Sequence, residues 1–150
     1  MAQTFSKMLV HVIFSTKERL PLIGSDWNDQ LFAYMGGIIK SEFGYPIRIN
    51  GVADHVHLLI DMKTSASAAD MVRVVKSRSS HWLHETFADS AGFSWQGGYG
   101  IFSIGESQQQ AAIAYINKQQ EHHRRVSFQE EFLAFLQRYQ VEYDPRYVWQ

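Results

Sequence analysis

The sequence contains no cysteine among its 150 residues. Disulfide bonds and thiolate zinc sites are therefore excluded, and a cytoplasmic location is the simplest expectation. No apolar run approaches the roughly 20 residues that a membrane-spanning helix needs, and no signal-like segment opens the chain. An excess of positive charge is also missing, because 14 Lys and Arg are balanced by 15 Asp and Glu. The composition argues against a broad, non-specific nucleic-acid binder, although local basic clusters stay compatible with DNA binding.

What the chain does contain is enough apolar surface for a folded core. Hydrophobic residues make up 45% of the sequence and charged residues only 19%, which is typical of a globular protein and not of a disordered one. No internal repeat, low-complexity tract or linker divides the chain. We therefore expect one domain that spans residues 1–150.

The first two thirds of the chain alternate between strand and helix patterns. The predicted elements are a strand at 9–15, a helix from Ser25 or Asp26 to Gly44, a strand at 47–52, a strand from Val56 that closes before Lys63, a helix from Ser65 or Ser67 to about Phe87, and a strand at 101–104. This β-α-β-β-α-β order predicts the ferredoxin-like fold of the α+β class, a four-stranded antiparallel sheet with helices on one face. The first and third strands should be central, and the second and third should form a hairpin.

Two further helices are predicted after the sheet. Ser107 and Gln110 have the spacing of a capping box, so one helix should begin there and run through Arg125. Ser127 and Glu130 repeat this spacing and should begin the second helix. The apolar positions of the second helix are Phe128, Phe132, Phe135, Leu136 and Tyr139.

Two histidines, His55 and His57, are separated by one residue in the third predicted strand. Side chains alternate along a strand, so both imidazoles would share one face, with Cα atoms roughly 6.5–7 Å apart. Neutral imidazole is the commonest nitrogen ligand of metals, so a single divalent metal can be held in front of this face. An ordinary strand with two exposed histidines is the alternative interpretation of this motif taken alone.

Tyr115 and Gln119 are four residues apart in a predicted helix and would lie on the same face, with His122 continuing the line. A tyrosine is a useful nucleophile only when its phenolate, with a pKa near 10, is stabilised and its electrophile is activated. A metal can polarise a phosphoryl oxygen, and the amide oxygen of Gln119 can serve as a third ligand beside two imidazoles. Such a site suits Mg²⁺ or Mn²⁺ better than a structural zinc. In the alternative interpretation, Tyr115 is a core aromatic residue and Gln119 a surface amide.

Several motifs resemble those of one family. Residues 54–59, Asp-His-Val-His-Leu-Leu, contain the HUH pattern of histidine, hydrophobic residue and histidine, and residues 115–123 resemble the tyrosine helix of single-tyrosine HUH transposases. These are small transposases of bacterial insertion sequences that move as single-stranded DNA. Residues 12–17, 95–103 and 143–147 resemble further segments of the family, so the likeness covers nearly the whole chain in the same order.

This resemblance implies the ferredoxin-like fold and a specific chemistry. Tyr115 would attack a phosphodiester of single-stranded DNA, forming a 5′-phosphotyrosine link and a free 3′-hydroxyl. His55, His57 and Gln119 would hold a divalent metal, Mg²⁺ or Mn²⁺. The DNA partner would form hairpins near the element ends. The protein would be a homodimer in which the tyrosine helix of one subunit can complete the site of the other, and Gly105 is compatible with a hinge before that helix. No membrane partner is expected.

Local basic clusters would have to contact the DNA phosphates, because the net charge is close to zero. The predicted contacts are Lys17 and Arg19 in the first loop, and Arg73, Lys76 and Arg78 on the second helix. A solvated helix face is the simpler interpretation of the helix cluster taken by itself.

Two other functions are compatible with parts of the pattern. A metal-dependent hydrolase would use His55, His57 and a carboxylate such as Asp61 to activate water, which leaves Tyr115 without a role. A non-catalytic nucleic-acid-binding module, such as an RNA-recognition domain, would require exposed aromatic residues on the central strands. This sequence has histidines and aliphatic residues at those positions.

Overall fold

A computed structural model describes residues 2–150 of the chain. Its core is a four-stranded sheet made of β1 (Leu9–Ser15), β2 (Gly44–Val52), β3 (His55–Met62) and β4 (Gly100–Ser103). The strand order is β2-β3-β1-β4, and every neighbouring pair is antiparallel. The predicted ferredoxin-like fold is therefore confirmed, with the first and third strands at the centre.

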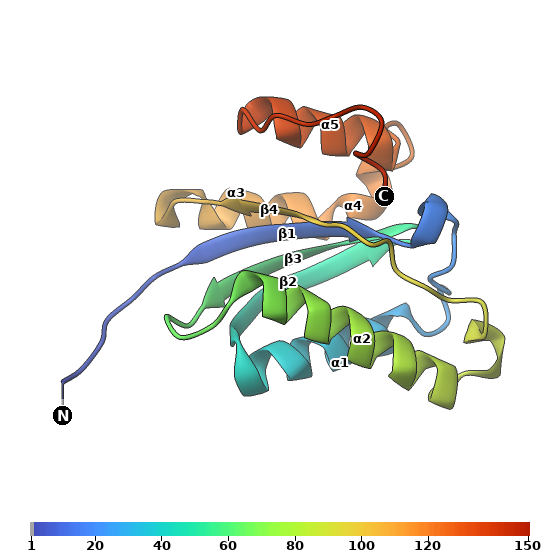
Figure 1. The fold of residues 1–150 in the computed structure, drawn as a ribbon, viewed down its shortest axis with the longest axis horizontal. Coiled ribbons are helices and arrows are strands. Elements are labelled where there is room, and N and C mark those ends of the chain that lie inside the picture. The colour runs from blue at the N-terminus through green and yellow to red at the C-terminus, as the bar shows by residue number, and fades with distance from the viewer. Residues whose placement is uncertain (1) are drawn as a thin grey trace.

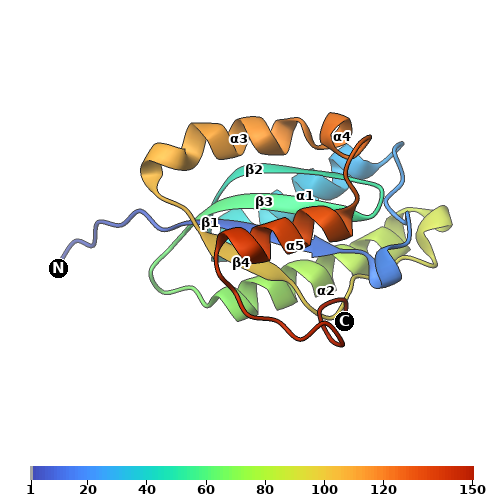
Figure 2. The ribbon, with the colours of Figure 1, turned by 90° about the horizontal axis from the view of Figure 1, so that it is seen from above.

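Helices cover both faces of this sheet (Figures 1 and 2). Helices α1 (Asn28–Glu42) and α2 (Ala68–Thr86) lie on one face, as the ferredoxin-like order predicts. The opposite face is covered by α3 (Gln109–Asn117), α4 (Gln119–His122) and α5 (Phe128–Arg138). Short 3₁₀ turns η1 (Lys17–Arg19), η2 (Ala88–Ser90) and η3 (Glu106–Gln108) complete the described elements. Over residues 2–150, no helix is both long and apolar enough to cross a membrane.

Strand β3 separates two different environments. Val56, Leu58 and Ile60 are fully buried in the apolar cluster beneath α1 and α2. His55 and His57 alternate with them, and they are fully buried as well, on the face covered by the C-terminal helices. The same strand therefore anchors the main core and presents two imidazoles on its other side.

Helix ends were predicted with mixed success. Ser67 caps α2 by accepting a hydrogen bond from the backbone N–H of Asp70 at 3.2 Å, as one of the two expected caps. Ser127 and Glu130 form the expected capping box at the start of α5. The prediction for α1 was wrong, because α1 begins at Asn28 without a side-chain cap.

The expected long helix through Arg125 is interrupted. Residues 106–108 form a 3₁₀ turn, so α3 begins only at Gln109, and Ser107 provides no capping hydrogen bond. Lys118 then leaves the helical conformation, with φ −99° and ψ 16°, and its N–H bonds to the carbonyl of Tyr115 at 3.2 Å. The chain re-enters a helix at Gln119, whose side chain is fully buried. The prediction of a single helix was therefore wrong, and the break lies between the two residues expected to act together.

Gly44 marks the boundary between α1 and β2. Its φ is +150°, and a Cβ at this position would collide with the backbone oxygen of Asp61. Any larger residue would therefore push β2 away from β3, so the predicted stop after α1 has a steric basis.

Candidate metal centre and tyrosine nucleophile

The buried polar groups on the α3–α5 side of the sheet come from four separate elements. Strand β3 provides His55 and His57, and β1 provides His11. Gln119 begins α4, and Glu131 lies in the first turn of α5. All five side chains are almost completely removed from solvent, with Glu131 only 3% exposed. Buried polar groups at this density require partners within the cluster.

His55 is oriented by the residue before it. Its Nδ1 lies 2.7 Å from Oδ1 of Asp54, and since a carboxylate can only accept, Nδ1 carries the hydrogen. Its Nε2 then faces two oxygen atoms, Oε1 of Gln119 and Oε1 of Glu131, each at 3.3 Å. Burial alone would lower the pKa of His55, but its hydrogen bonds to Asp54 and Glu131 raise it. A carboxylate behind a histidine is the arrangement that fixes the tautomer of metal-bound imidazoles.

His57 is held in a similar way by another histidine. Its Nδ1 lies 2.8 Å from Nε2 of His11, and its Nε2 lies 2.9 Å from Oε1 of Glu131. Burial, together with the neighbouring His55 and His123, lowers the pKa of His57 to about 4. Burial and the neighbouring His57 lower the pKa of His11 to about 3. His57 is therefore neutral near pH 7, which is the form that binds a metal.

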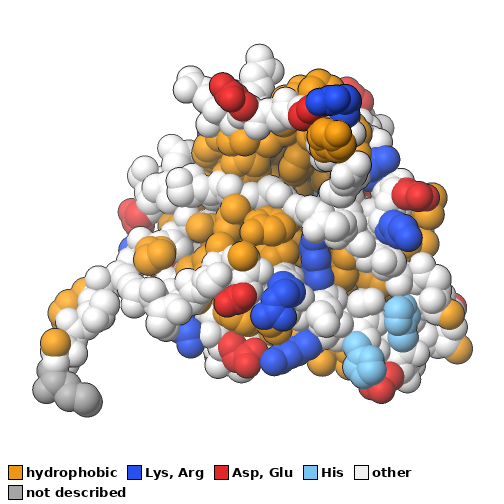
Figure 3. Space-filling view, in the orientation of Figure 1, with side chains coloured by type: hydrophobic (Ala, Val, Ile, Leu, Met, Phe, Trp, Pro, Cys, Tyr) orange, Lys and Arg blue, Asp and Glu red, His pale blue; other side chains and the backbone are white. Residues whose placement is uncertain are grey.

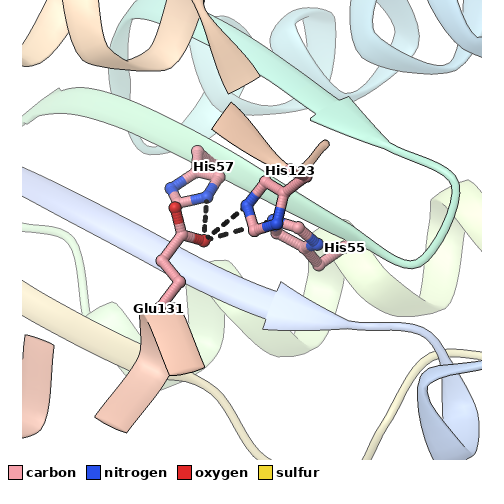
Figure 4. A group of neighbouring side chains, drawn as sticks. All are labelled: His55, His57, His123 and Glu131. Carbon is pink, nitrogen blue, oxygen red and sulfur yellow. Dashed lines mark hydrogen bonds and ion pairs between the residues drawn. The ribbon is translucent and has the colours of Figure 1, made fainter. Parts of the chain in front are cut away.

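Glu131 contacts His55, His57 and Gln119, and it was not identified from the sequence. Its Oε1 faces three imidazoles, namely His57, His55 and His123, at 2.9, 3.3 and 3.1 Å (Figure 4). Its Oε2 accepts a hydrogen bond from Nε2 of Gln119 at 3.2 Å. Burial alone would raise the pKa of this carboxyl, but the imidazoles hold it well below its usual range. Glu131 is thus an anion at the centre of the cluster.

His123 provides a further imidazole nitrogen. Its Nδ1 lies 2.6 Å from the backbone carbonyl of Val126, an atom that can only accept, so Nδ1 is the protonated nitrogen. Its Nε2 is buried and makes no hydrogen bond of acceptable geometry within the described chain, although it lies 3.1 Å from Oε1 of Glu131. Ligand atoms of His55, His57, His123 and Glu131 all fall within 4.8 Å of one another. This donor set and the unsatisfied nitrogen fit a divalent metal ion.

Tyr115 reaches the same carboxylate from α3. Its hydroxyl donates a hydrogen bond to Oε2 of Glu131 and lies 3.4 Å from Nε2 of His122. The centroids of the Tyr115 and His57 rings are 5.8 Å apart. Burial and the negative charge of Glu131 raise the pKa of Tyr115, so the phenol stays protonated near neutral pH. The expected neighbourhood of Tyr115, His57 and Gln119 is therefore present within one chain.

A surface pocket opens directly beside Tyr115. It has a volume of about 450 Å³, and its wall includes Lys118, His122 and Arg125. Lys118 and Arg125 bring positive charge to this wall. A second pocket, of about 340 Å³, is lined by both Tyr115 and Glu131, so the phenol and the carboxylate border the same opening.

Asp61 does not belong to this centre. It lies near the far end of β3, where its carboxylate accepts a hydrogen bond from the backbone N–H of Met8 at 3.1 Å. Lys7 lies 3.9 Å from the same side chain. Asp61, the example of a carboxylate given for the hydrolase alternative, is therefore not placed beside the two histidines.

The basic residues expected on α2 are engaged in contacts within the protein. Arg78 forms an ion pair with Glu42 at 2.8 Å, and Arg73 lies 3.6 Å from Asp70. Lys76 donates to the carbonyls of Gln96 and Gly98 at 2.9 and 2.6 Å, and burial lowers its pKa to about 8. In Figure 3, Lys and Arg side chains on this face are interspersed with Asp and Glu.

Of the two basic residues expected in the first loop, Arg19 makes contacts within the protein and Lys17 is exposed. Arg19 donates to the carbonyl of Trp149 at 3.2 Å and its guanidinium lies 5.4 Å from the centre of that ring. Arg19 therefore holds the C-terminal segment in place. Lys17 lies in the exposed 3₁₀ turn η1.

Glu131 and His11 were not predicted as site residues, but both are polar residues at positions where the sequence pattern is apolar. Glu131 lies three residues after Phe128 and four before Phe135, so it occupies the apolar stripe of α5, which a solvated glutamate would avoid. His11 interrupts an apolar strand in the same manner. A charged or polar residue on a face that must be buried indicates a partner there, although it does not say which one.

The comparisons with known proteins agree with this fold. The family model described as "Transposase IS200 like" matches residues 4–119. The chain therefore belongs to this transposase family. No curated protein sequence matches the chain.

Two solved structures have a similar fold. One is a candidate transposase from Deinococcus radiodurans R1, which is 21% identical with a TM-score of 0.63, over 79% of this chain and 95% of that one. The other is a REP-associated tyrosine transposase bound to a REP hairpin, which is 12% identical with a TM-score of 0.60, over 84% of this chain and 74% of that one. At these identities the likeness establishes the fold.

Proposed function

We propose that this transposase cuts and rejoins single-stranded DNA through a 5′-phosphotyrosine intermediate at Tyr115. His55, His57 and Gln119 are the proposed holders of the divalent metal, Mg²⁺ or Mn²⁺. The observation that carries the proposal is the shared carboxylate, because the Tyr115 hydroxyl and both β3 imidazoles contact Glu131. A nucleophile and a metal-binding pair so close together can act on one phosphate.

The proposed reaction is a transesterification. The Tyr115 oxygen loses its proton and forms a bond to phosphorus, while the bond from phosphorus to the 3′ oxygen breaks. The 3′ oxygen takes up one proton and leaves as a hydroxyl, so the number of protons is unchanged. When bound, a divalent cation supplies a Lewis acid that polarises a non-bridging phosphoryl oxygen. Oε2 of Glu131 already accepts the hydrogen bond of the phenol, so it is placed to take the proton that Tyr115 must lose. The phosphotyrosine link keeps the phosphodiester energy, so a second 3′-hydroxyl can reverse the reaction.

Hairpin recognition is part of the same proposal. One of the two similar structures is bound to a REP hairpin, which supports a hairpin substrate for this chain. Lys17, Arg19, Arg73, Lys76 and Arg78 are the proposed phosphate contacts. Lys76 and Arg19 would have to exchange carbonyl partners within the protein for phosphates, so the larger contributions are expected from the other three.

We further propose a homodimer whose active sites are shared. The tyrosine helix follows a completed sheet and is joined to it through Gly105, where a Cβ would meet only Oγ of Ser107, at 4.0 Å. Such a segment can exchange between identical chains at low cost. Mixing Tyr115→Phe with a His55→Ala/His57→Ala variant should restore cleavage, because one site of a heterodimer would hold both defects and the other none. A mixture that stays inactive after verified subunit exchange would place each complete site in one chain.

The reaction is tested with single-stranded DNA that carries a hairpin, labelled at either end. In Mn²⁺, the 5′-labelled product should migrate as free DNA, whereas the 3′-labelled product should stay attached to the protein in denaturant. Tyr115→Phe should bind the hairpin with unchanged affinity and give neither product. Cleavage by Tyr115→Phe, or two free DNA products from the wild type, would contradict the proposal.

A further inference from the structure

The N–H groups of His55 and His123 point away from the Glu131 carboxylate, and the other ring nitrogen of each histidine faces it. The Nδ1 atoms of His55 and His123 are committed as donors to Asp54 and to the carbonyl of Val126. In the neutral state of either ring, Nε2 is then a lone pair, and both lone pairs face Oε1 of Glu131, which is also an acceptor. A cation between these atoms removes the mismatch, and either a proton on one of the rings or a metal ion can supply it.

The separations between the carboxylate oxygen of Glu131 and the three imidazole nitrogens suit a metal ion. For ligand bonds of about 2.1 Å, neighbouring ligand atoms at angles between octahedral and tetrahedral lie about 3.0–3.4 Å apart. Oε1 of Glu131 lies 2.9, 3.1 and 3.3 Å from Nε2 of His57, His123 and His55.

Gln119 is positioned differently from the carboxylate. Its Oε1 contacts His55 at 3.3 Å, and its Nε2 donates to Oε2 of Glu131 at 3.2 Å. The Gln119 amide therefore fixes the His55 ring and the Glu131 carboxylate relative to each other. An ionised carboxylate is a stronger ligand for hard divalent cations than a neutral amide, and it offsets part of their charge.

We infer that Glu131 of α5 is a metal ligand, which joins His55 and His57 in a set of two histidines and one carboxylate. The inference rests on the proposed function for the presence of the metal, and it adds a ligand from a helix that follows the tyrosine helix. Glu131 lies outside residues 4–119, which are the part of the chain matched by the family model. The C-terminal helix therefore contributes directly to the metal site in addition to covering it. Metal binding should accordingly stabilise the docking of α5 on the sheet.

Calorimetric titration of Mn²⁺ into DNA-free protein tests the inference independently of catalysis. Glu131→Gln keeps the shape of the side chain and removes the charge, and it should weaken Mn²⁺ binding by at least about 10-fold. Glu130→Gln is the matched control, because it removes the same charge one residue away at an exposed position. It should change the affinity less than about twofold, since the Glu130 carboxylate is exposed and its charge is screened by water and salt. Equal affinities for wild type and a folded Glu131→Gln would overturn the inference.

A second measurement needs no variant. In crystals of the wild-type protein grown with Mn²⁺, the anomalous peak should lie within about 2.3 Å of a Glu131 oxygen and of Nε2 of His55 and His57. A peak bound by His55, His57 and Gln119 with Glu131 turned away would overturn the inference while leaving the proposed function intact. An absence of Mn²⁺ binding to the wild-type protein would overturn both.

Discussion

The two faces of the sheet differ in what their buried residues do. Beneath α1 and α2 the interior is apolar, and Val56, Leu58 and Ile60 of β3 pack there against helix side chains. Beneath α3–α5, His55 and His57 from the same strand meet Glu131 and His11 instead, beside a smaller apolar cluster of α5 residues. Successive residues of one strand therefore serve different purposes, and the apolar face supplies the rigidity that fixes the polar face.

The largest expected effect is a loss of strand cleavage when residues of the polar face are changed. His55→Ala and His57→Ala should each lower strand cleavage by at least about 100-fold, because each removes an imidazole nitrogen from the proposed metal site. Single-turnover cleavage in Mn²⁺, with folding checked by circular dichroism, measures the effect. In excess chelator the wild-type rate should fall to the rate of the variants. Wild-type activity that survives in chelator would separate the histidines from any metal.

The matched change on the apolar face is Leu58→Ala, next to His57 in the same strand. It should lower the free energy of unfolding by about 2–5 kcal/mol, because it opens a cavity in a fully buried core. The cleavage rate per folded molecule should stay close to that of the wild type. Urea unfolding and active-site titration measure the two quantities. A loss of cleavage as large as that of His57→Ala in the folded fraction would remove the distinction between the faces.

A difference in pH dependence should follow from the buried histidines. His57 and His11 have pKa values of about 4 and about 3 in the folded protein, below the usual value near 6.5, so unfolding takes up protons below pH 6.5. The free energy of unfolding should therefore fall as the pH drops from about 6.5 towards 4, by at most about 1.4 kcal/mol per pH unit for each histidine. His11→Gln should flatten this slope by about one proton, as measured by urea unfolding in chelator.

Leu58→Ala is the control for this pH experiment. It should shift the whole curve downwards without changing its slope, since it removes no titrating group. Equal slopes for wild type and His11→Gln would contradict the assignment of a buried, neutral His11.

The smallest expected effect is on the salt dependence of DNA binding, through the contacts that α2 side chains are proposed to make with DNA phosphates. Arg73→Ala should reduce the salt dependence of single-stranded DNA binding by about 0.7 units for each phosphate that the protein no longer neutralises. Arg146→Ala is the control, because its guanidinium is paired with Asp144 at 2.8 Å in the C-terminal segment. Fluorescence anisotropy across a salt series measures both slopes. An unchanged slope for Arg73→Ala would mean that α2 presents an ordinary solvated face.

The sheet and its central strands were predictable because local signals agree with the tertiary fold. Alternation along β3, the apolar run of β1 and the caps at Ser67 and Ser127 each depend on neighbours in sequence. The break at Lys118 was not predictable from helix propensity, because the residues on both sides continue a helical pattern. Burial of Gln119 against His55, a tertiary contact, accompanies that break.

The candidate site was predictable only in part, because one of its residues joins it through a contact between distant parts of the chain. His55, His57, Tyr115 and Gln119 form short motifs, so their spacing indicates a shared face. Glu131 reaches them only because α5 folds back over the sheet, which joins residues 74 positions apart in the chain. Its position on the apolar stripe of α5 signals a buried partner, and the partner becomes known only from the structure.

Identification of the residue that carries the DNA tests the central claim most directly. Wild-type protein incubated with Mn²⁺ and hairpin-bearing single-stranded DNA should be digested with nuclease and trypsin and analysed by tandem mass spectrometry. A nucleotide linked through its 5′ phosphate to Tyr115, and absent from Tyr115→Phe, is the result this account predicts. Cleaved DNA with no protein adduct, or an adduct on another residue, would contradict it.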